Sequence, residues 1–246
     1  MITAIVNGQE LPLNARKEWE SKRLVVASRF LKRKLGYTQK ITSSADFLNL
    51  KLETSEDNMR QALRHSLALS SLLTKAMTIL SFGRRKQRVT EFIIHGCSAE
   101  TLFHGFNCMM LENTSENRTH CLAACPDHYL LKGCKDHMQE VIEAAASMPL
   151  PLQFFVTYGD EEGLVTPKDS SYPFQAAGIA RLKNGFAMGG VRHQMKDIPD
   201  GCAVRLTVEF PALLPNSSIR EHQLHLACEF YHWFDTLLVQ NPDTQS

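Results

Sequence analysis

The architecture follows from SSIREHQLHLACEFYHWFDTLLVQ, residues 217–240, which predicts one long helix near the end of the chain. Ser217 and Ser218 are candidate N-caps, because a serine hydroxyl accepts from the free N–H groups of a first helical turn. Asn241-Pro242 supplies a stop signal. Apolar side chains form a stripe along this helix: Leu226, Phe230, Trp233 and Leu237. We expect the stripe to pack against a sheet.

Strand-like runs precede this helix and are separated by Gly, Pro, Asn and Asp. They are 152–158 (LQFFVTY), 174–182 (FQAAGIARL), 185–195 (GFAMGGVRHQM) and 202–210 (CAVRLTVEF). Ile198-Pro199-Asp200-Gly201 is a plausible type I turn that joins the last two as a hairpin. Helices, an antiparallel sheet and a closing helix together predict an α+β fold.

Two helices are predicted before the sheet. Residues 15–35 form a basic helix that ends at Gly36, and residues 56–82 form a longer one that Ser55 opens. We expect residues 1–88 to be an N-terminal helical region used for packing or dimerisation, and 89–246 to be the second domain. Arg84-Arg85-Lys86-Gln87-Arg88 either contacts phosphate or an acidic partner, or is a solvated connector, and we favour the connector.

Composition restricts the class of protein. The 246 residues include 27 Lys+Arg and 26 Asp+Glu, and this balance argues against a nucleic-acid partner. Residues 1–22 have no apolar run of signal-peptide length, and no stretch is apolar enough for a membrane span. We therefore expect a cytoplasmic protein that interacts with no membrane. Its seven cysteines lack CxxC spacing, so reduced thiols are expected.

The most informative polar pattern lies on the last helix. His222, His225, Glu229 and His232 recur at helical spacing and form one stripe beside the apolar one. His225 and Glu229 are one turn apart, so an imidazole nitrogen and a carboxylate oxygen can meet on one cation. These ligand types suit zinc or another first-row divalent metal. We expect both side chains to face a cavity, with His222 or His232 nearer solvent.

Further ligand types occur between residues 120 and 146. Pro126-Asp127-His128 follows a stretch rich in Cys and His, and His137 and Glu140 lie three apart on an expected helix over 134–146. Cys125 is either a thiolate ligand or a buried inert thiol, and we favour the thiol. Three or four protein ligands with an open position would make a catalytic metal site.

Three segments stand in a fixed order along residues 92–240. They are His95-Gly-Cys-Ser-Ala-Glu100 with Phe106 and Pro126-Asp127-His128; Met188-Gly-Gly-Val-Arg-His193-Gln194 with Pro199-Asp200-Gly201-Cys202; and His225-x-x-x-Glu229. Together they resemble the 2,4-diacetylphloroglucinol hydrolase and phloretin hydrolase family. That family cleaves a carbon–carbon bond between an acyl group and a phenolic ring.

The resemblance implies a fold, a metal and a ligand set. The fold is the helix-grip arrangement of Bet v 1-like proteins, in which a curved antiparallel sheet wraps the long C-terminal helix. The metal is zinc, held by two His and two Glu. Carried over by position, the ligands are His128, His225 and Glu229, with Glu140 as the fourth and Glu143 as the alternative.

The expected reaction is metal-dependent hydrolysis of an acylphloroglucinol-type ketone, a small aromatic polyketide or phenolic ketone. Expulsion of a ring carbon requires an acid or base, and His193 is our choice because imidazole titrates near neutrality. Tyr129 is a second candidate catalytic residue, and Tyr158 and Tyr172 are candidate substrate-binding residues. All three tyrosines could instead serve core packing.

Two other functions stay open from the sequence. A metal-free aromatic polyketide cyclase or small-molecule binding protein would use the same fold and cavity. A non-catalytic interaction protein would use the basic helices at 15–35 and 56–88, and strongly salt-dependent binding to nucleic acid would support it. A homodimer formed through the N-terminal helices is a further expectation.

Overall fold

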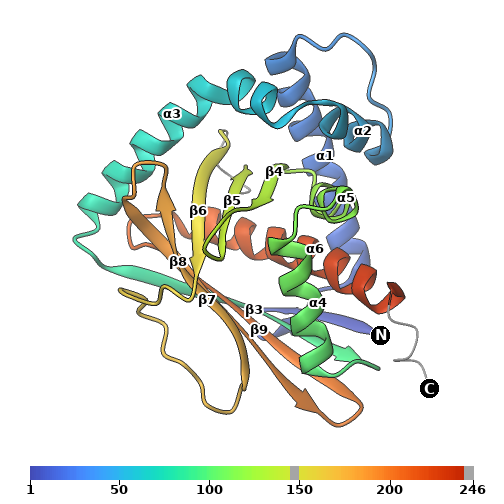
Figure 1. Ribbon diagram of the computed structural model, residues 1–246, viewed down its shortest axis with the longest axis vertical. Coiled ribbons are helices and arrows are strands. Elements are labelled where there is room, and N and C mark those ends of the chain that lie inside the picture. Colours follow the sequence, from blue (N-terminus) through green and yellow to red (C-terminus); the bar gives the residue numbers. More distant parts are fainter. Residues whose placement is uncertain (145–149, 241–246) are drawn as a thin grey trace.

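The computed structural model describes residues 1–144 and 150–240, and an antiparallel sheet lies at its centre (Figure 1). The strands found in these residues are β1 (Ile2–Val6), β2 (Gln9–Glu10), β3 (Arg85–His95), β4 (His128–Gly133), β5 (Met138–Glu143), β6 (Leu152–Tyr158), β7 (Phe174–Leu182), β8 (Ala187–Ile198) and β9 (Gly201–Pro211). Their order in the sheet is β2-β1-β3-β9-β8-β7-β6-β5-β4. The chain therefore builds the sheet from β4 to β9 as successive neighbours and closes it onto the N-terminal strands.

Helices cover the sheet. They are α1 (Leu13–Leu35), α2 (Ser44–Glu53), α3 (Glu56–Leu80), α4 (Ala99–Leu111), α5 (Ser115–Ala123) and α6 (Asn216–Gln240). The main core forms where α6 meets the sheet and α4: Phe234 of α6 packs edge-on against Phe92 of β3 with ring centroids 5.3 Å apart. This confirms the predicted α+β helix-grip fold, with a long C-terminal helix held by the sheet.

A second hydrophobic core lies between the N-terminal helices and strands β4 and β5. It contains Leu31 of α1, Phe47 of α2 and Leu63 of α3, which pack with Tyr129 and Ile142 of β4 and β5. Figure 1 shows α1, α2 and α3 gathered around the end of the sheet that β4 closes. Strands β4 and β5 are therefore buried on both faces.

Several predicted elements are confirmed. The runs at 152–158 and 174–182 are β6 and β7 with the same bounds, and residues 198–201 join β8 to β9 as the predicted hairpin. Asp200 has a positive φ (62°), so the turn is not of the predicted type I, which has negative φ at both central residues. The two N-terminal helices are α1 and α3, and Gly36 ends α1 in the left-handed conformation (φ 65°). Ser55 accepts from the N–H of Asn58 as the predicted N-cap of α3.

Three other local predictions are wrong. The helix expected over 134–146 is absent from the described residues of that range, where β5 occupies Met138–Glu143. The basic run belongs to strand β3 from Arg85 on, and Arg85 donates to Glu209 of β9 at 2.7 Å, so it is no solvated connector. Helix α6 begins at Asn216, which places Ser217 and Ser218 inside its first turn, while Asn241-Pro242 lies outside the described residues.

The N-terminus contributes to the sheet rather than to a helical layer alone. Val6 pairs with Gln9 across Asn7-Gly8, and both turn residues have positive φ (53° and 75°), as a two-residue hairpin requires. Strand β1 then pairs along β3. The boundary expected at residue 88 falls inside β3, so one sheet includes residues from both predicted domains.

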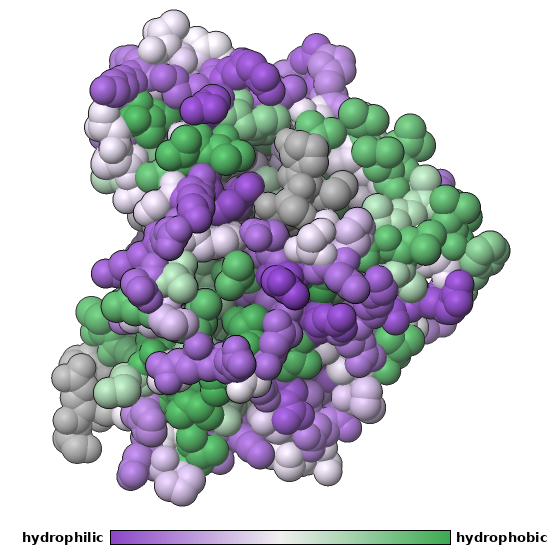
Figure 2. Space-filling view, turned by 180° about the vertical axis from the view of Figure 1, so that it is seen from behind, coloured by the Kyte–Doolittle hydropathy of each residue, from purple (hydrophilic) through white to green (hydrophobic). Residues whose placement is uncertain are grey.

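Helix α3 changes character along its length. Its first half contributes Met59, Leu63 and Leu67 to the second core, whereas its second half and the following turn expose apolar side chains: Leu69, Leu72, Leu73, Ile79, Leu80 and Phe82. Figure 2 shows hydrophobic side chains gathered on the side of the molecule where α3 lies. Among the described residues, no helix is long and apolar enough to cross a bilayer. The homodimer stays a prediction.

Candidate metal centre

Four ionisable side chains converge between β4, β5 and α6. They are His128, Glu143, His225 and Glu229, and one ligand atom of each lies within 4.8 Å of the others. Both histidines are fully buried, and the two glutamates are 6% and 5% exposed. Burying two carboxylates is costly unless a positive charge compensates them. The group could therefore hold a metal ion.

The distances within this cluster fit a cation at its centre. His128 Nε2 lies 2.8 Å from Glu229 Oε2 and 3.2 Å from His225 Nε2. His225 Nε2 lies 3.3 Å from Glu229 Oε2 and 3.5 Å from Glu143 Oε2. Nitrogens and oxygens bound to a tetrahedral zinc ion at its usual bond lengths lie roughly 3.3–3.5 Å apart. His128 Nε2 lies 3.9 Å from Glu143 Oε2, so the pairs of atoms span 2.8–3.9 Å and bracket the separation that such an ion requires.

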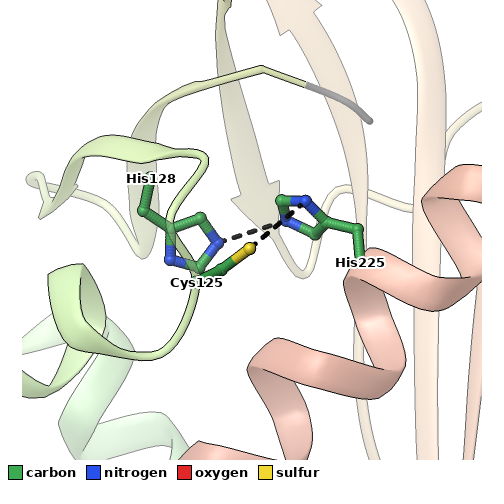
Figure 3. A group of neighbouring side chains, drawn as sticks. All are labelled: Cys125, His128 and His225. Atoms are coloured by element: carbon green, nitrogen blue, oxygen red, sulfur yellow. Dashed lines mark hydrogen bonds between the residues drawn. The ribbon is translucent and has the colours of Figure 1, made fainter. Parts of the chain in front are cut away.

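The other ring nitrogens orient the two imidazoles. His128 Nδ1 lies 2.7 Å from the carbonyl oxygen of Cys121, which can only accept, so Nδ1 carries a proton and Nε2 is the nitrogen that faces the cluster. His225 Nδ1 contacts Cys125 Sγ at 3.7 Å. Figure 3 shows both rings turned toward each other with Cys125 beside them. A ligand histidine commonly binds a second group through its other nitrogen in this way.

The electrostatics of the cluster favour a positive charge. Burial raises the pKa of Glu229, but attraction to His225 and the hydrogen bond with His128 outweigh it and bring the pKa to about 2. Burial also opposes ionisation of Glu143, and the charge of His225 again lowers its pKa. For His225, burial lowers the pKa, while Cys125 and both carboxylates raise it well above its usual range. Both glutamates therefore remain charged while buried.

The strand register of β5 decides which glutamate joins the cluster. Successive side chains of a strand alternate between faces, so residues three apart point oppositely. Glu143 faces the cluster, whereas Glu140 lies on the face toward α3, where Arg60 donates to it at 2.7 Å. The structure brings together His128, His225 and Glu229 with Glu143, the alternative, and leaves Glu140 in an ion pair.

Helices α1 and α2 fix the segment that carries His128. Arg23 of α1 donates two hydrogen bonds, both of 2.7 Å, to the buried carboxylate of Asp127. Lys51 of α2 is fully enclosed and donates to the carbonyl oxygens of Leu122 and Cys125. Burial lowers the pKa of Lys51 to about 8. The N-terminal helices therefore position a cluster residue, a role that the sequence did not indicate.

A cavity of about 160 Å³ borders the cluster on the side of Glu143 and Glu229. Its walls are mostly apolar, with aromatic side chains from α4, β6, β9 and α6: Phe106, Phe154, Tyr158, Phe210, Phe230 and Trp233. An engineered cavity of about 150 Å³ is large enough for benzene. The cavity has room for an aromatic ring next to the two carboxylates.

Two further histidines line this cavity. His193 of β8 is 5% exposed, and burial lowers its pKa to about 4, so the imidazole is neutral at pH 7. His222 of α6 has a side chain that is 12% exposed, and its Nε2 lies 3.9 Å from Glu143 Oε1. His232 is the histidine of the helical stripe nearer solvent, with a side chain that is 35% exposed. His225 and Glu229 face inward, as the stripe predicted.

The three predicted tyrosines lie in different places. Tyr158 lines the cavity and donates to Gln139 Oε1 at 3.3 Å. Tyr129 follows His128 in β4 and faces the second core, with its ring 6.1 Å from that of Phe30, so the structure removes it from the candidate catalytic group. Tyr172 lies away from the cavity, between the cations of Lys196 and Arg205, and has no contact with the cluster.

Another group with metal-ligand atoms lies between α1 and α6. Glu20, Cys228 and His232 approach one another within 4.8 Å. Arg16 lies 3.3 Å from His232 Nε2, however, and its guanidinium stacks on Tyr231. A permanent cation beside these atoms disfavours a metal ion there. The four-residue cluster is the better candidate site.

Comparisons with known proteins give structural similarity only. No family model matches the sequence, and no curated protein matches it. The crystal structure of Ara h 8.0201 aligns with a TM-score of 0.42 and 9% identity, over 63% of this chain and 99% of that chain. An uncharacterized protein from Rhizobium leguminosarum aligns with a TM-score of 0.35 and 12% identity, over 64% and 96% of the two chains. Neither similarity assigns a ligand or an activity to this chain.

Proposed function

We propose that this protein is a metal-dependent hydrolase that cleaves the carbon–carbon bond between an acyl group and a phenolic ring. The observation that carries the proposal is the buried cluster of His128, Glu143, His225 and Glu229 at the wall of an aromatic-lined cavity. Two imidazole nitrogens and two carboxylate oxygens suit zinc or a similar divalent metal, which we assign to this cluster. Such a metal supplies Lewis acidity and lowers the pKa of bound water.

The protein's own residues would perform the remaining tasks. Hydrolysis adds the hydroxyl of water to the acyl carbon and a proton to the ring carbon, so a group that carries protons is required. His193 lines the cavity and is neutral at pH 7, so it can accept the proton of water and return it to the ring. Its pKa of about 4 lies below the near-neutral value expected from the sequence, so it is a weaker base than a free imidazole. The apolar walls favour an aromatic ring beside the carboxylates.

The test incubates metal-loaded protein with a panel of acylphloroglucinols and dihydrochalcones and measures the carboxylic acid released. We expect cleavage by the wild type and none by Glu229→Gln, because that variant has one charge fewer at the metal. His193→Ala should keep its metal and lose about 10²–10⁴-fold in turnover.

A metal-free binding protein or cyclase is the second candidate function. It is favoured by the hydrogen bond between His128 and Glu229, because protonated histidines could balance the carboxylates in place of a metal. The same panel of acylphloroglucinols and dihydrochalcones distinguishes the hydrolase from the binding protein or cyclase. Turnover that survives exhaustive chelation would contradict the hydrolase. Binding or cyclisation of a panel member without any cleavage would also favour the second candidate.

A further inference from the structure

Three buried side-chain nitrogens have no hydrogen-bond partner among the residues that the structure describes: His193 Nδ1, His222 Nδ1 and Trp233 Nε1. They come from two elements, β8 and α6. All three residues line the same cavity beside the metal cluster. A buried polar group without a partner costs about 1–3 kcal/mol, and native proteins satisfy nearly all of them. A ligand in the cavity can supply the missing partners.

The positions of two of these residues relate them directly to the cluster. The indole of Trp233 stacks on the ring of His128 at 5.8 Å, and the ring of His222 stacks on that of His225 at 5.6 Å. On α6, His222, Leu226, Glu229 and Trp233 recur at helical spacing and all line the cavity. Residues that carry these nitrogens therefore lie along the same wall as the glutamate at the metal site.

The chemistry of the nitrogens indicates what they bind. An indole N–H only donates, so its partner must be an acceptor. An imidazole Nδ1 donates in one tautomer and accepts in the other. A phenolic hydroxyl both accepts and donates, so hydroxyls on one ring can satisfy all three atoms. A hydrocarbon ring would satisfy none, although it would fit the apolar walls equally well.

We infer that Trp233, with His193 and His222, forms a subsite that binds the ring hydroxyls of a polyhydroxylated aromatic ligand. Trp233 Nε1 donates to one hydroxyl oxygen, and the two imidazoles bind the others. The subsite deepens the proposed function, since its role in turnover rests on that function, whereas binding itself does not require cleavage.

The experiment compares phloroglucinol with mesitylene, in which each hydroxyl is replaced by a methyl group of similar size. Neither compound carries an acyl group, so neither can be cleaved. Calorimetric titration of the full-length protein gives a dissociation constant for each. We expect Trp233→Phe to weaken phloroglucinol binding roughly 5- to 10-fold more than mesitylene binding, because the N–H is the only polar group lost and the apolar ring atoms lost with it contact both compounds. His222→Phe should likewise weaken the binding of phloroglucinol more than the binding of mesitylene.

Trp19 provides the matched control. The chain has two tryptophans, and Trp19 Nε1 already donates to Glu221 at 2.9 Å. Trp19→Phe should therefore leave the ratio of the two affinities unchanged. Equal weakening of both ligands by Trp233→Phe, or no weakening of either, would overturn the subsite.

A spectroscopic measurement covers the case in which Trp233→Phe does not fold. In ¹H–¹⁵N spectra of the wild type, each indole N–H gives one signal, and Trp19→Phe assigns them. Phloroglucinol should move the Trp233 signal downfield while mesitylene does not, as a new N–H···O hydrogen bond requires. A Trp233 signal that responds identically to both compounds would contradict the inference. If the protein prefers phloroglucinol to mesitylene but cleaves no acylphloroglucinol, the hydrolase proposal is wrong and the hydroxyl-binding subsite is still supported.

Discussion

Glu140 and Glu143 differ in function because of their positions in one strand. Glu143 belongs to the buried cluster with His128, His225 and Glu229, and Glu140 is bound by Arg60 and Gln153 on the opposite face. We predict that Glu143→Gln lowers zinc affinity at least a hundredfold, beyond the 10- to 100-fold typical of outer-shell changes. Glu140→Gln, the matched control, should lower the free energy of unfolding and leave zinc affinity unchanged. Competition with a chromophoric chelator measures both affinities, and the reverse pattern would assign the site to Glu140.

His193 gives the protein a defined sensitivity to acid. Burial lowers its pKa from 6.5 to about 4 in the folded chain, so the unfolded chain binds the extra proton first as pH falls. The free energy of unfolding should therefore decrease between pH 6.5 and 4, by at most about 3 kcal/mol from this group. His193→Gln lacks this contribution, so its stability relative to wild type should improve as pH falls. Urea unfolding in the presence of chelator measures this, and a difference independent of pH would refute it.

At the scale of elements, the connection between α5 and β4 depends on α1. The buried ion pair of Arg23 and Asp127 holds the residue next to His128. We predict that Asp127→Asn weakens zinc binding about 10- to 100-fold, as the loss of an orienting partner does. Asp57→Asn is the control, since Asp57 pairs with Arg60 at an exposed position and should have no effect. Equal zinc affinities for the two variants would show that α1 does not orient His128.

The sequence predicted elements well where long strand-like runs are bounded by turn residues, or where one face of a helix is apolar. The strands β6 to β9 are separated by Gly, Pro, Asn and Asp, the closing helix has an apolar stripe, and the structure has all of them. Strand β5 (MQEVIE) is buried on both faces, so its side chains do not alternate between apolar and polar, and periodicity could not identify it. The hairpin at Asn7-Gly8 was not predicted, although Asn-Gly is a strong sequence signal for a two-residue turn between two strands.

At the scale of the whole molecule, the candidate site combines segments that are distant in sequence. His225 and Glu229 could be predicted because one helix carries both at ligand spacing. His128 was predicted to be a metal ligand only because of the family resemblance. The choice of Glu143 over Glu140 required the strand register. The cavity and the supporting role of Arg23 and Lys51 depend on tertiary packing between elements, which local patterns do not encode.

The central claim is that His128, Glu143, His225 and Glu229 hold one divalent metal. The most direct test is elemental analysis of untagged protein after dialysis against zinc and removal of free metal, for wild type and Glu229→Gln. We predict stoichiometric zinc in the wild type and its loss in the variant, with both proteins folded by circular dichroism. Wild-type protein that retains no zinc, or a variant that retains as much as wild type, would contradict the claim.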